Sequence, residues 1–260
     1  MGGVYEFDGD KYLRASKHQK EWGQKLISEF HFIGSESILD LGCGDGVLTK
    51  MIADRVPSGN ILGIDVSEGM IKKAKELKQD NLRFQLLNIN DIDFEEEFDI
   101  IISNATLHWV LGHKKLIKNC HRALKENGVI RFNLAGDRNC SNLISVIRDI
   151  MNREAYKRYF ADFEWPWCMP TILDYRRLLT VNNFGKIRIW DENADRYFKD
   201  VDEMISWIDQ PAIVPFITRI DDSEKVNFRK AVIDKMVSIT REGDGRCFET
   251  FRRINVYGEK

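Results

Sequence analysis

The chain of 260 residues carries a formal net charge of −2 at pH 7, and 43% of its residues are hydrophobic. This balance argues against the basic surface of nucleic-acid-binding proteins, and no apolar run reaches the ~20 residues needed to span a bilayer. The five cysteines and five histidines show neither C-x-x-C pairs nor metal-ligand spacing. We therefore expect a globular, cytoplasmic protein with free thiols, no metal, no signal peptide and no nucleic-acid or membrane partner.

The first half of the chain alternates short apolar runs with helical patterns. Strands are expected at residues 37–42, 60–66, 82–89, 98–105 and 128–136, and helices between them at 47–56, 68–79 and 113–128. Gly128 is expected to be the C-terminal cap of the last of these helices. Strands separated by helices predict parallel βαβ units, and continuous apolar strands predict a sheet covered on both faces. The predicted fold class is α/β, with a doubly wound, mostly parallel, Rossmann-like sheet.

The second half is expected to form a cap and to complete the sheet. Residues 139–184 read as a helical cap inserted over the carboxyl edge of the sheet, with an aromatic-rich loop, "YFADFEWPWCMP". Residues 185–260 read as a strand pair at 185–199, two helices and a closing alternating run, which supply antiparallel strands and part of the pocket. Together with a cofactor-binding core at 30–138, this predicts one domain over residues 1–260. A separate C-terminal domain is the alternative.

The stretch "LGCGDG" lies between the first expected strand and helix, where open α/β sheets bind ligands. Gly42 and Gly44 allow positive φ and close approach of a ligand to the backbone. The spacing departs from the G-x-G-x-x-G of dinucleotide-binding loops, and Asp40 and Asp45 would repel a pyrophosphate by on the order of several kcal/mol. A ligand with a sulfonium and an amine would instead be attracted, so the loop favours S-adenosylmethionine.

Asp65 ends the second expected strand about 20 residues after the glycine loop, where a carboxylate can accept hydrogen bonds from both ribose hydroxyls. Nicotinamide-dependent proteins share this position. Asp65 therefore predicts a ribose but does not separate S-adenosylmethionine from a nicotinamide cofactor. The glycine spacing and the preceding acid separate the two.

Four successive segments resemble the motifs of class I S-adenosylmethionine-dependent methyltransferases: "ILDLGCGDG", "GIDVSEGMI", "NINDIDFEEEFDIIISNATLHWV" and "RALKENGVIRF". The resemblance covers residues 35–135. It implies S-adenosylmethionine as cofactor, with Asp65 on the ribose, and Asn88 departs from the acid of the related proteins because its amide carries no charge. The full set of cofactor-binding residues that the resemblance implies is Gln19, Asp40, Gly42, Cys43, Gly44, Asp65, Val66, Met70, Asn88, Ile89 and Asn104.

Softer motifs outside this core, such as "YLRASKHQKEW" and "FETFRRINVYGEK", resemble trans-aconitate methyltransferases and juvenile-hormone-acid methyltransferases. That resemblance implies O-methylation of the carboxylate of a small organic acid. The chemistry is compatible, because a carboxylate with a pKa near ~4 is ionised at neutral pH and requires no general base. Positioning of the acid against the methyl group can supply much of the rate.

The expected catalytic residues are His108, as a hydrogen-bond partner of the acceptor oxygen, and Trp109, as a wall near the methyl group. The alternative for His108 is a satisfied histidine in a loop. Arg252 and Arg253 lie on opposite faces of an alternating strand, so at most one of them faces the pocket. The residues expected to contact substrate are Tyr12, Trp109, Tyr197, Trp207 and Arg252.

Three other functions stay open at this point. One is a methyltransferase for an amine or a phenol, with His108 as the base. Another is a catalytically silent module that binds S-adenosylmethionine, suggested by Asn88 and by the lack of a dedicated base. A nicotinamide-dependent oxidoreductase is the third. The identity of the acceptor and the oligomeric state do not follow from the sequence.

Overall fold

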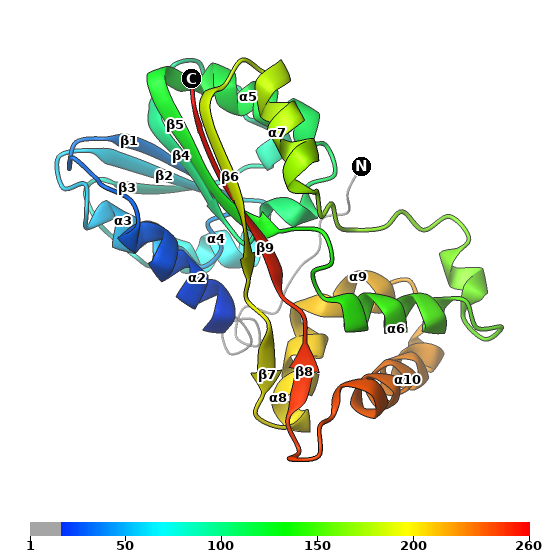
Figure 1. Cartoon of the computed structure of the whole chain (residues 1–260). Helices are drawn as coiled ribbons and strands as arrows, with labels where there is room; N and C mark the ends of the chain where they lie inside the picture. The colour runs from blue at the N-terminus through cyan, green and yellow to red at the C-terminus, as the bar shows by residue number, and fades with distance from the viewer. Residues whose placement is uncertain (1–16) are drawn as a thin grey trace.

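A seven-stranded sheet in the order β3-β2-β1-β4-β5-β9-β6 forms the centre of the computed structural model (Figure 1). The structure describes residues 17–260, and for residues 17–20 it describes the backbone alone. The first five strands pair in parallel, whereas β9 is antiparallel to β5 and to β6. β6 therefore runs in the same direction as β5. The doubly wound, mostly parallel α/β sheet is confirmed. Its strands are β1 (Ser37–Leu41), β2 (Asn60–Asp65), β3 (Leu82–Leu86), β4 (Phe98–Asn104), β5 (Leu124–Ala135), β6 (Gly185–Asn193) and β9 (Arg252–Glu259).

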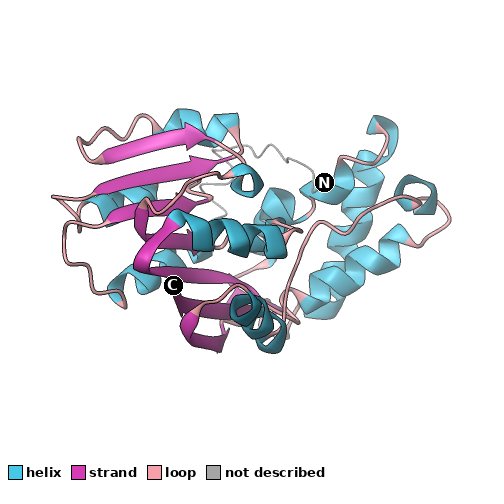
Figure 2. Ribbon diagram, turned by 90° about the horizontal axis from the view of Figure 1, so that it is seen from above, coloured by secondary structure: helices cyan, strands magenta, loops and turns pink. Residues whose placement is uncertain are grey.

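Alternation along β1 and β4 divides the core between the two faces of the sheet. Ile38 and Ile102 pack with residues of α2 and α3, whereas Leu39 and Ile101 pack with residues of α5 and α7. This two-sided burial explains why these strands are continuously apolar. Figure 2 shows helices against both faces of the sheet. The helices around the sheet are α2 (Lys17–Ser28), α3 (Val47–Ala53), α4 (Glu68–Ala74), α5 (His113–Ala123) and α7 (Ile172–Val181).

The helix expected at 113–128 is shorter than predicted. α5 ends at Ala123, and β5 begins at once with Leu124, which is fully buried opposite Phe98. The pairing then shifts, because Ile100 lies opposite Val129, so residues 125–128 form a bulge. Gly128 is part of this bulge and is not a helix cap; a Cβ there would lie 2.8 Å from the Lys125 carbonyl oxygen. Burial of Leu124 outweighs the helical pattern of the segment.

Residues from both 139–170 and 196–251 build the layer over the carboxyl ends of the strands, which we call the cap. They share one apolar cluster with Ala105, the residue that follows β4. The cap is thus not confined to 139–184: α7 packs on β6 and the sheet core instead. Both strands expected at 185–199 are present, but they do not pair with each other: β6 joins the main sheet and β7 pairs with β8. The cap elements are α6 (Ser141–Met151), η3 (Lys157–Phe160), β7 (Arg196–Phe198), α8 (Val201–Trp207), η4 (Ile208–Ala212), α9 (Val214–Ile217), α10 (Asp222–Thr240) and β8 (Cys247–Glu249).

Residues 17–260 contain neither a membrane-spanning helix nor a cluster of metal-binding side chains. No helix in this range is both long and apolar enough to cross a membrane. The same range contains no group of three or more His, Cys, Asp or Glu side chains able to hold a metal ion. All five cysteines are free thiols.

Candidate active site

The loop after β1 has positive φ at three positions, Gly42, Gly44 and Gly46, a conformation that glycine adopts at the lowest cost. A Cβ on Gly42 would lie 2.1 Å from the Thr106 side chain, so glycine lets β4's carboxyl end approach the loop. At Gly44, by contrast, an added Cβ would meet no described atom within 4 Å. Gly44 therefore presents bare backbone to open space, as a cradle for a ligand requires.

Asp65, at the end of β2, holds this loop in place. One carboxylate oxygen accepts from the Gly44 amide at 3.0 Å, and the other accepts from the Ser67 amide at 2.9 Å. The next residue, Val66, is an exposed apolar side chain beside this carboxylate, whereas Met70 is buried in α4. The end of β2 thus offers an acceptor and an apolar surface side by side, which suits a ribose and its base.

Asp40 lies beneath the loop and is 2% exposed. The Thr49 hydroxyl donates to its carboxylate at 2.7 Å. Burial raises the pKa of Asp40 to about 6; the hydrogen bond from Thr49 opposes this shift, and the charge of Asp65 adds to it. Asp40 is therefore mostly ionised at pH 7. Burial, reinforced by Asp40 and Asp65, raises the pKa of the Cys43 thiol well above its usual value, so Cys43 is neutral.

The remaining predicted cofactor residues lie on the neighbouring strand ends. The Asn88 side-chain oxygen accepts from the Asn90 amide at 2.9 Å and caps the short helix η1 (Ile89–Asp91). Ile89 turns its side chain into the sheet core, which leaves only its backbone for a cofactor. The Asn104 carbonyl oxygen lies 3.3 Å from the Thr106 hydroxyl. Two predicted residues stay untested: Gln19 lies on α2 with its side chain undescribed, and Tyr12 lies outside the described residues.

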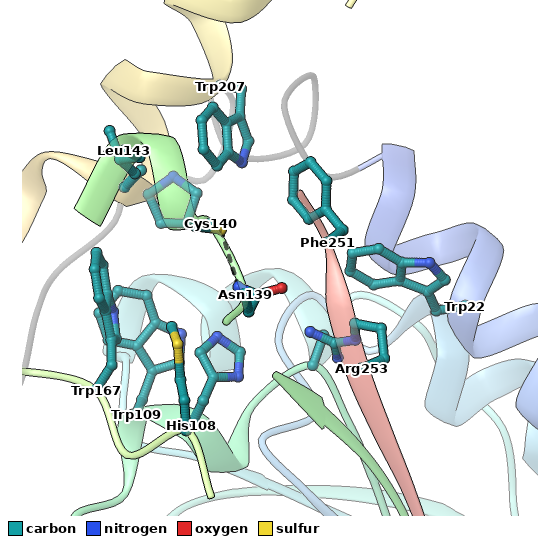
Figure 3. A pocket seen from close by; sticks show the side chains of 14 residues that line it. Trp22, His108, Trp109, Asn139, Cys140, Leu143, Trp167, Trp207, Phe251 and Arg253 are labelled. Carbon is teal, nitrogen blue, oxygen red and sulfur yellow. Dashed lines mark hydrogen bonds between the residues drawn. The ribbon is translucent and has the colours of Figure 1, made fainter. Parts of the chain in front are cut away.

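Next to the loop, the sheet and the cap enclose a pocket of about 590 Å³, its open mouth included (Figure 3). Four tryptophans from distant segments line its wall: Trp22 from α2, Trp109 from η2 (Leu107–Trp109), Trp167 from the aromatic loop and Trp207 from α8. Trp109 and Trp167 meet edge to face, with ring centroids 5.7 Å apart. The lining comprises Trp22, Ala105, His108, Trp109, Asn139, Cys140, Leu143, Trp167, Met169, Trp207, Pro211, Ala212, Phe251 and Arg253.

Arg253 is the charged side chain of this lining. It is 2% exposed, and its Nε and Nη2 atoms donate to the Asn133 side-chain oxygen at 3.0 and 2.6 Å. The guanidinium also lies 4.2 Å from the centroid of the Trp22 ring, as a cation–π contact. Figure 3 shows it among the aromatic residues of the wall.

Arg252 was the wrong choice between the two neighbouring arginines. Its side chain points away from the pocket, where it pairs with Asp195 and donates to the Asn193 side-chain oxygen at 2.7 Å. The reason is strand alternation, which turns consecutive residues of β9 to opposite faces. Tyr197 is also misplaced: on β7 it is 47% exposed and packs on Phe248 instead of lining the pocket.

His108 lines the pocket, and its ring is neutral. Burial, with smaller contributions from the charges of Arg253 and His113, lowers its pKa well below 6.5. Among the described residues nothing bonds to its Nδ1 atom, and the same holds for Trp167 Nε1. The His108 carbonyl oxygen accepts from the Cys168 amide at 2.8 Å, so the end of β4 and the aromatic loop are joined beside these two atoms. Both side chains retain hydrogen-bonding capacity at the pocket.

Sequence reasoning named only His108, Trp109 and Trp207 among the fourteen lining residues and missed the other eleven. The missed residues with the clearest contribution are Trp22, Asn139, Trp167, Phe251 and Arg253. Trp22 and Trp167 stand in quoted aromatic stretches, which was the available signal, but only the folded chain shows which rings face the pocket. Segment 104–109 links the two halves of the site, because Thr106 contacts Gly42 while Ala105, His108 and Trp109 line the pocket.

The chain is similar to known methyltransferases in sequence and in fold. Residues 34–200 match the family described as "Methyltransferase domain". Trans-aconitate 2-methyltransferase of Mycobacterium tuberculosis is 26% identical over 97% of this chain and 96% of its own length, and that of Rhodococcus jostii is 26% identical over 97% and 99%. The YcgJ protein of Bacillus subtilis has a similar fold, with a TM-score of 0.63, 17% identity and coverage of 93% of this chain and 98% of its own.

A glycine cradle, an acid at the end of the second strand and a pocket beside them fit a methyltransferase site. The chain belongs to the class I S-adenosylmethionine-dependent methyltransferases. It is an enzyme of that class and uses S-adenosylmethionine as its methyl donor. The open backbone at Gly44 and the acceptors of Asp65 fit this donor, and membership of the methyltransferase family sets the nicotinamide alternative aside.

Proposed function

We propose that the protein O-methylates the carboxylate of a small organic acid. One observation carries this proposal: Arg253 is the single charged side chain among the described residues that line the pocket. A buried guanidinium offers planar donors that match a carboxylate, whereas it would repel a protonated amine. The two relatives named as trans-aconitate 2-methyltransferases support the same class of acceptor.

The residues around Arg253 suit an acceptor with one carboxylate and an apolar body. The tryptophans, Leu143 and Met169 provide an apolar wall that excludes water. S-adenosylmethionine supplies a methyl group on a positively charged sulfur. The carboxylate and that sulfur lose their charges together as the ester forms, so a dry aromatic wall, which disfavours the separated charges, favours the reaction. Alignment of the acid with the methyl group lowers the barrier by several kcal/mol more.

His108 serves this chemistry as a hydrogen-bond partner and is a poor general base. Its lowered pKa keeps the ring neutral at pH 7 but also makes its nitrogen weakly basic. An ionised carboxylate needs no proton removed, so a weak base is sufficient. Methylation of an amine or a phenol, with His108 as base, would have to overcome this weak basicity and the adjacent positive charge of Arg253.

An acceptor screen tests the proposal. The purified protein is incubated with S-adenosylmethionine carrying a labelled methyl group and with matched monocarboxylates, trans-aconitate, amines and phenols. Label transferred to an acid and released by mild alkali identifies a methyl ester, and we expect it with acids that carry one carboxylate on an apolar body. Transfer to amines or phenols alone, in alkali-stable form, would refute the carboxylate assignment.

A further inference from the structure

Arg253 is the inner end of a continuous chain of hydrogen bonds that reaches the surface. The Asn133 side-chain oxygen accepts from Arg253, and the Asn133 amide nitrogen donates to the Asn255 side-chain oxygen at 3.0 Å. The Asn255 nitrogen in turn donates to Glu192 at 3.1 Å. At the outer end, the Lys25 ammonium donates to the other oxygen of Glu192 at 2.6 Å. Asn133, Asn255 and Arg253 are each 3% exposed or less, so the inner part of the chain is dry.

The sheet itself brings these groups together. Asn133 on β5 lies directly opposite Asn255 on β9, and Glu192 on β6 lies opposite Arg253. Arg253 and Asn255 are two residues apart on one strand, so their side chains leave the same face. The chain of hydrogen bonds therefore crosses three neighbouring strands at the edge nearest the pocket.

The chemistry of the two ends fixes the orientation of both asparagine amides. A carboxylate only accepts hydrogen bonds and a guanidinium only donates them. Glu192 therefore selects the nitrogen of Asn255, whose oxygen then faces the nitrogen of Asn133. The oxygen of Asn133 is left for Arg253, in agreement with the observed contacts. Every hydrogen-bonding group in this chain of contacts has a partner in only one orientation of the two asparagine amides.

Two neutral amides thus separate a positive group from a negative one. Burial opposes ionisation of Glu192, but hydrogen bonds from Lys25 and Asn255 lower its pKa below the usual value, so its carboxylate is charged. Direct contact between that carboxylate and Arg253 would cancel the positive charge at the pocket. Asn133 instead offers Arg253 a neutral acceptor, which holds the guanidinium in place.

We propose that Asn133 and Asn255, oriented by Glu192, are positioning residues that hold Arg253 for the acceptor carboxylate. This inference rests on the proposed carboxylate methylation. None of the three residues lines the pocket itself, so their effect passes through Arg253. Their loss is therefore expected to change acceptor binding and not cofactor binding.

The Asn133→Asp variant places a carboxylate against Arg253 at nearly constant volume. We expect the KM for the acid to rise at least 20-fold, with kcat within fivefold and the affinity for S-adenosylmethionine within twofold of the unaltered protein. Asn81→Asp is the matched control, because Asn81 donates to the carbonyls of Ala53 and Val56, away from the pocket. The control is expected to lower the melting temperature without raising the acceptor KM.

A second measurement covers the case in which Asn133→Asp does not fold. The Nε–H signal of Arg253, assigned by its loss in Arg253→Lys, is expected to exchange slowly with water because it is buried and bonded to Asn133. In Glu192→Ala, whose side chain is 21% exposed and tolerates truncation, exchange should accelerate at least tenfold and the acceptor KM should rise about fivefold.

Unchanged KM and unchanged Nε–H exchange in the folded variants, within twofold, would overturn the positioning role. A protein that methylates no acid at all would instead refute the proposed function. The exchange rates of Arg253 would still report on the hydrogen-bond chain in that case, so the two failures are distinguishable.

Discussion

The two halves of the active site are built in different ways. The cofactor loop depends on the main chain: it has three glycines with positive φ and is held by one acid, Asp65, which lies 21 residues after Gly44. The acceptor pocket is a matter of side chains, drawn from positions between Trp22 and Arg253. The first depends on local backbone geometry, and the second exists only after the cap has packed on the sheet.

This contrast separates what substitutions should do. A change in the loop is expected to weaken binding of S-adenosylmethionine, whereas a change in the pocket is expected to weaken binding of the acid.

The largest effect is expected from Gly44→Val. The new side chain would occupy the open space that the loop leaves for the cofactor, and its backbone would be strained at a φ of 54°. Since the strain costs only about 1–3 kcal/mol, the protein should fold, but calorimetry should detect no binding of S-adenosylmethionine. Gly243→Ala, at a glycine with no described atom within 4 Å and no positive φ, is the control and should bind normally. Near-normal binding by Gly44→Val would remove the cofactor from this loop.

Arg253→Met should have the largest effect on the pocket. Removal of a buried charged partner costs about 2–5 kcal/mol, so kcat/KM for the acid should fall roughly 100-fold while cofactor affinity stays within twofold. Arg252→Met is the matched control, because the neighbouring side chain pairs with Asp195 outside the pocket. Equal losses in both variants would show that the effect is structural and that Arg253 has no special role.

Asp65→Ala should weaken binding of S-adenosylmethionine by about 1–3 kcal/mol, through loss of a charged acceptor. The loop itself should also loosen, because Asp65 holds the Gly44 amide. Asp65→Asn keeps an acceptor for that amide. In calorimetric titrations its affinity for S-adenosylmethionine should therefore lie between those of the unaltered protein and Asp65→Ala. Unchanged affinity in a folded Asp65→Ala variant would mean that the ribose lies elsewhere.

Asp40 predicts a pH dependence of cofactor binding. Its folded-state pKa of about 6 is above the usual value, so its charge is present at pH 7 and is lost as the pH falls through 6. Loss of a negative charge beneath a cationic ligand weakens binding, and affinity should drop up to about tenfold between pH 7 and pH 5. Asp40→Asn, which can still accept from Thr49, should bind with a flat profile over this range.

The smallest effect concerns His108. Because burial and Arg253 keep its pKa well below 6.5, it should not titrate between pH 6.5 and 8.5. With both substrates saturating, kcat for the acid should be flat over this range, and His108→Asn should lower it less than about tenfold. If kcat rises with pH over this range and the rise disappears in His108→Asn, then His108 acts as a general base.

The contrast between the main-chain loop and the side-chain pocket also decides how much of the fold and of the site could be predicted from the sequence. The order of the first strands and helices follows from apolar periodicity, and the glycine loop can be recognised because its geometry depends on residue type at fixed spacing. The bulge at 125–128 was missed because burial of Leu124, a tertiary effect, decides where α5 ends. Arg252 was chosen over Arg253 because a shift of one residue along a strand reverses the face, and nothing local fixes that register.

The cap shows the same limit. Residues 196–251 share a core with α6, yet no periodicity connects segments so far apart. Tyr197 and Trp207 looked equivalent in sequence. β7 pairs with β8 and carries Tyr197 to the surface, whereas the end of α8 carries Trp207 into the pocket. The sequence therefore indicated that aromatic and basic side chains of these segments line the pocket, but it did not show which individual residues do so.

The central claim is that a carboxylate binds at Arg253 beside the cofactor loop. The most direct test is a crystal structure with S-adenosylhomocysteine and an acid that the acceptor screen identifies. We expect the carboxylate within hydrogen-bonding distance of the Arg253 guanidinium, between the tryptophans of the wall, and the cofactor along Gly44 and Asp65. An acid bound away from Arg253, or a pocket filled by the cofactor itself, would contradict the account.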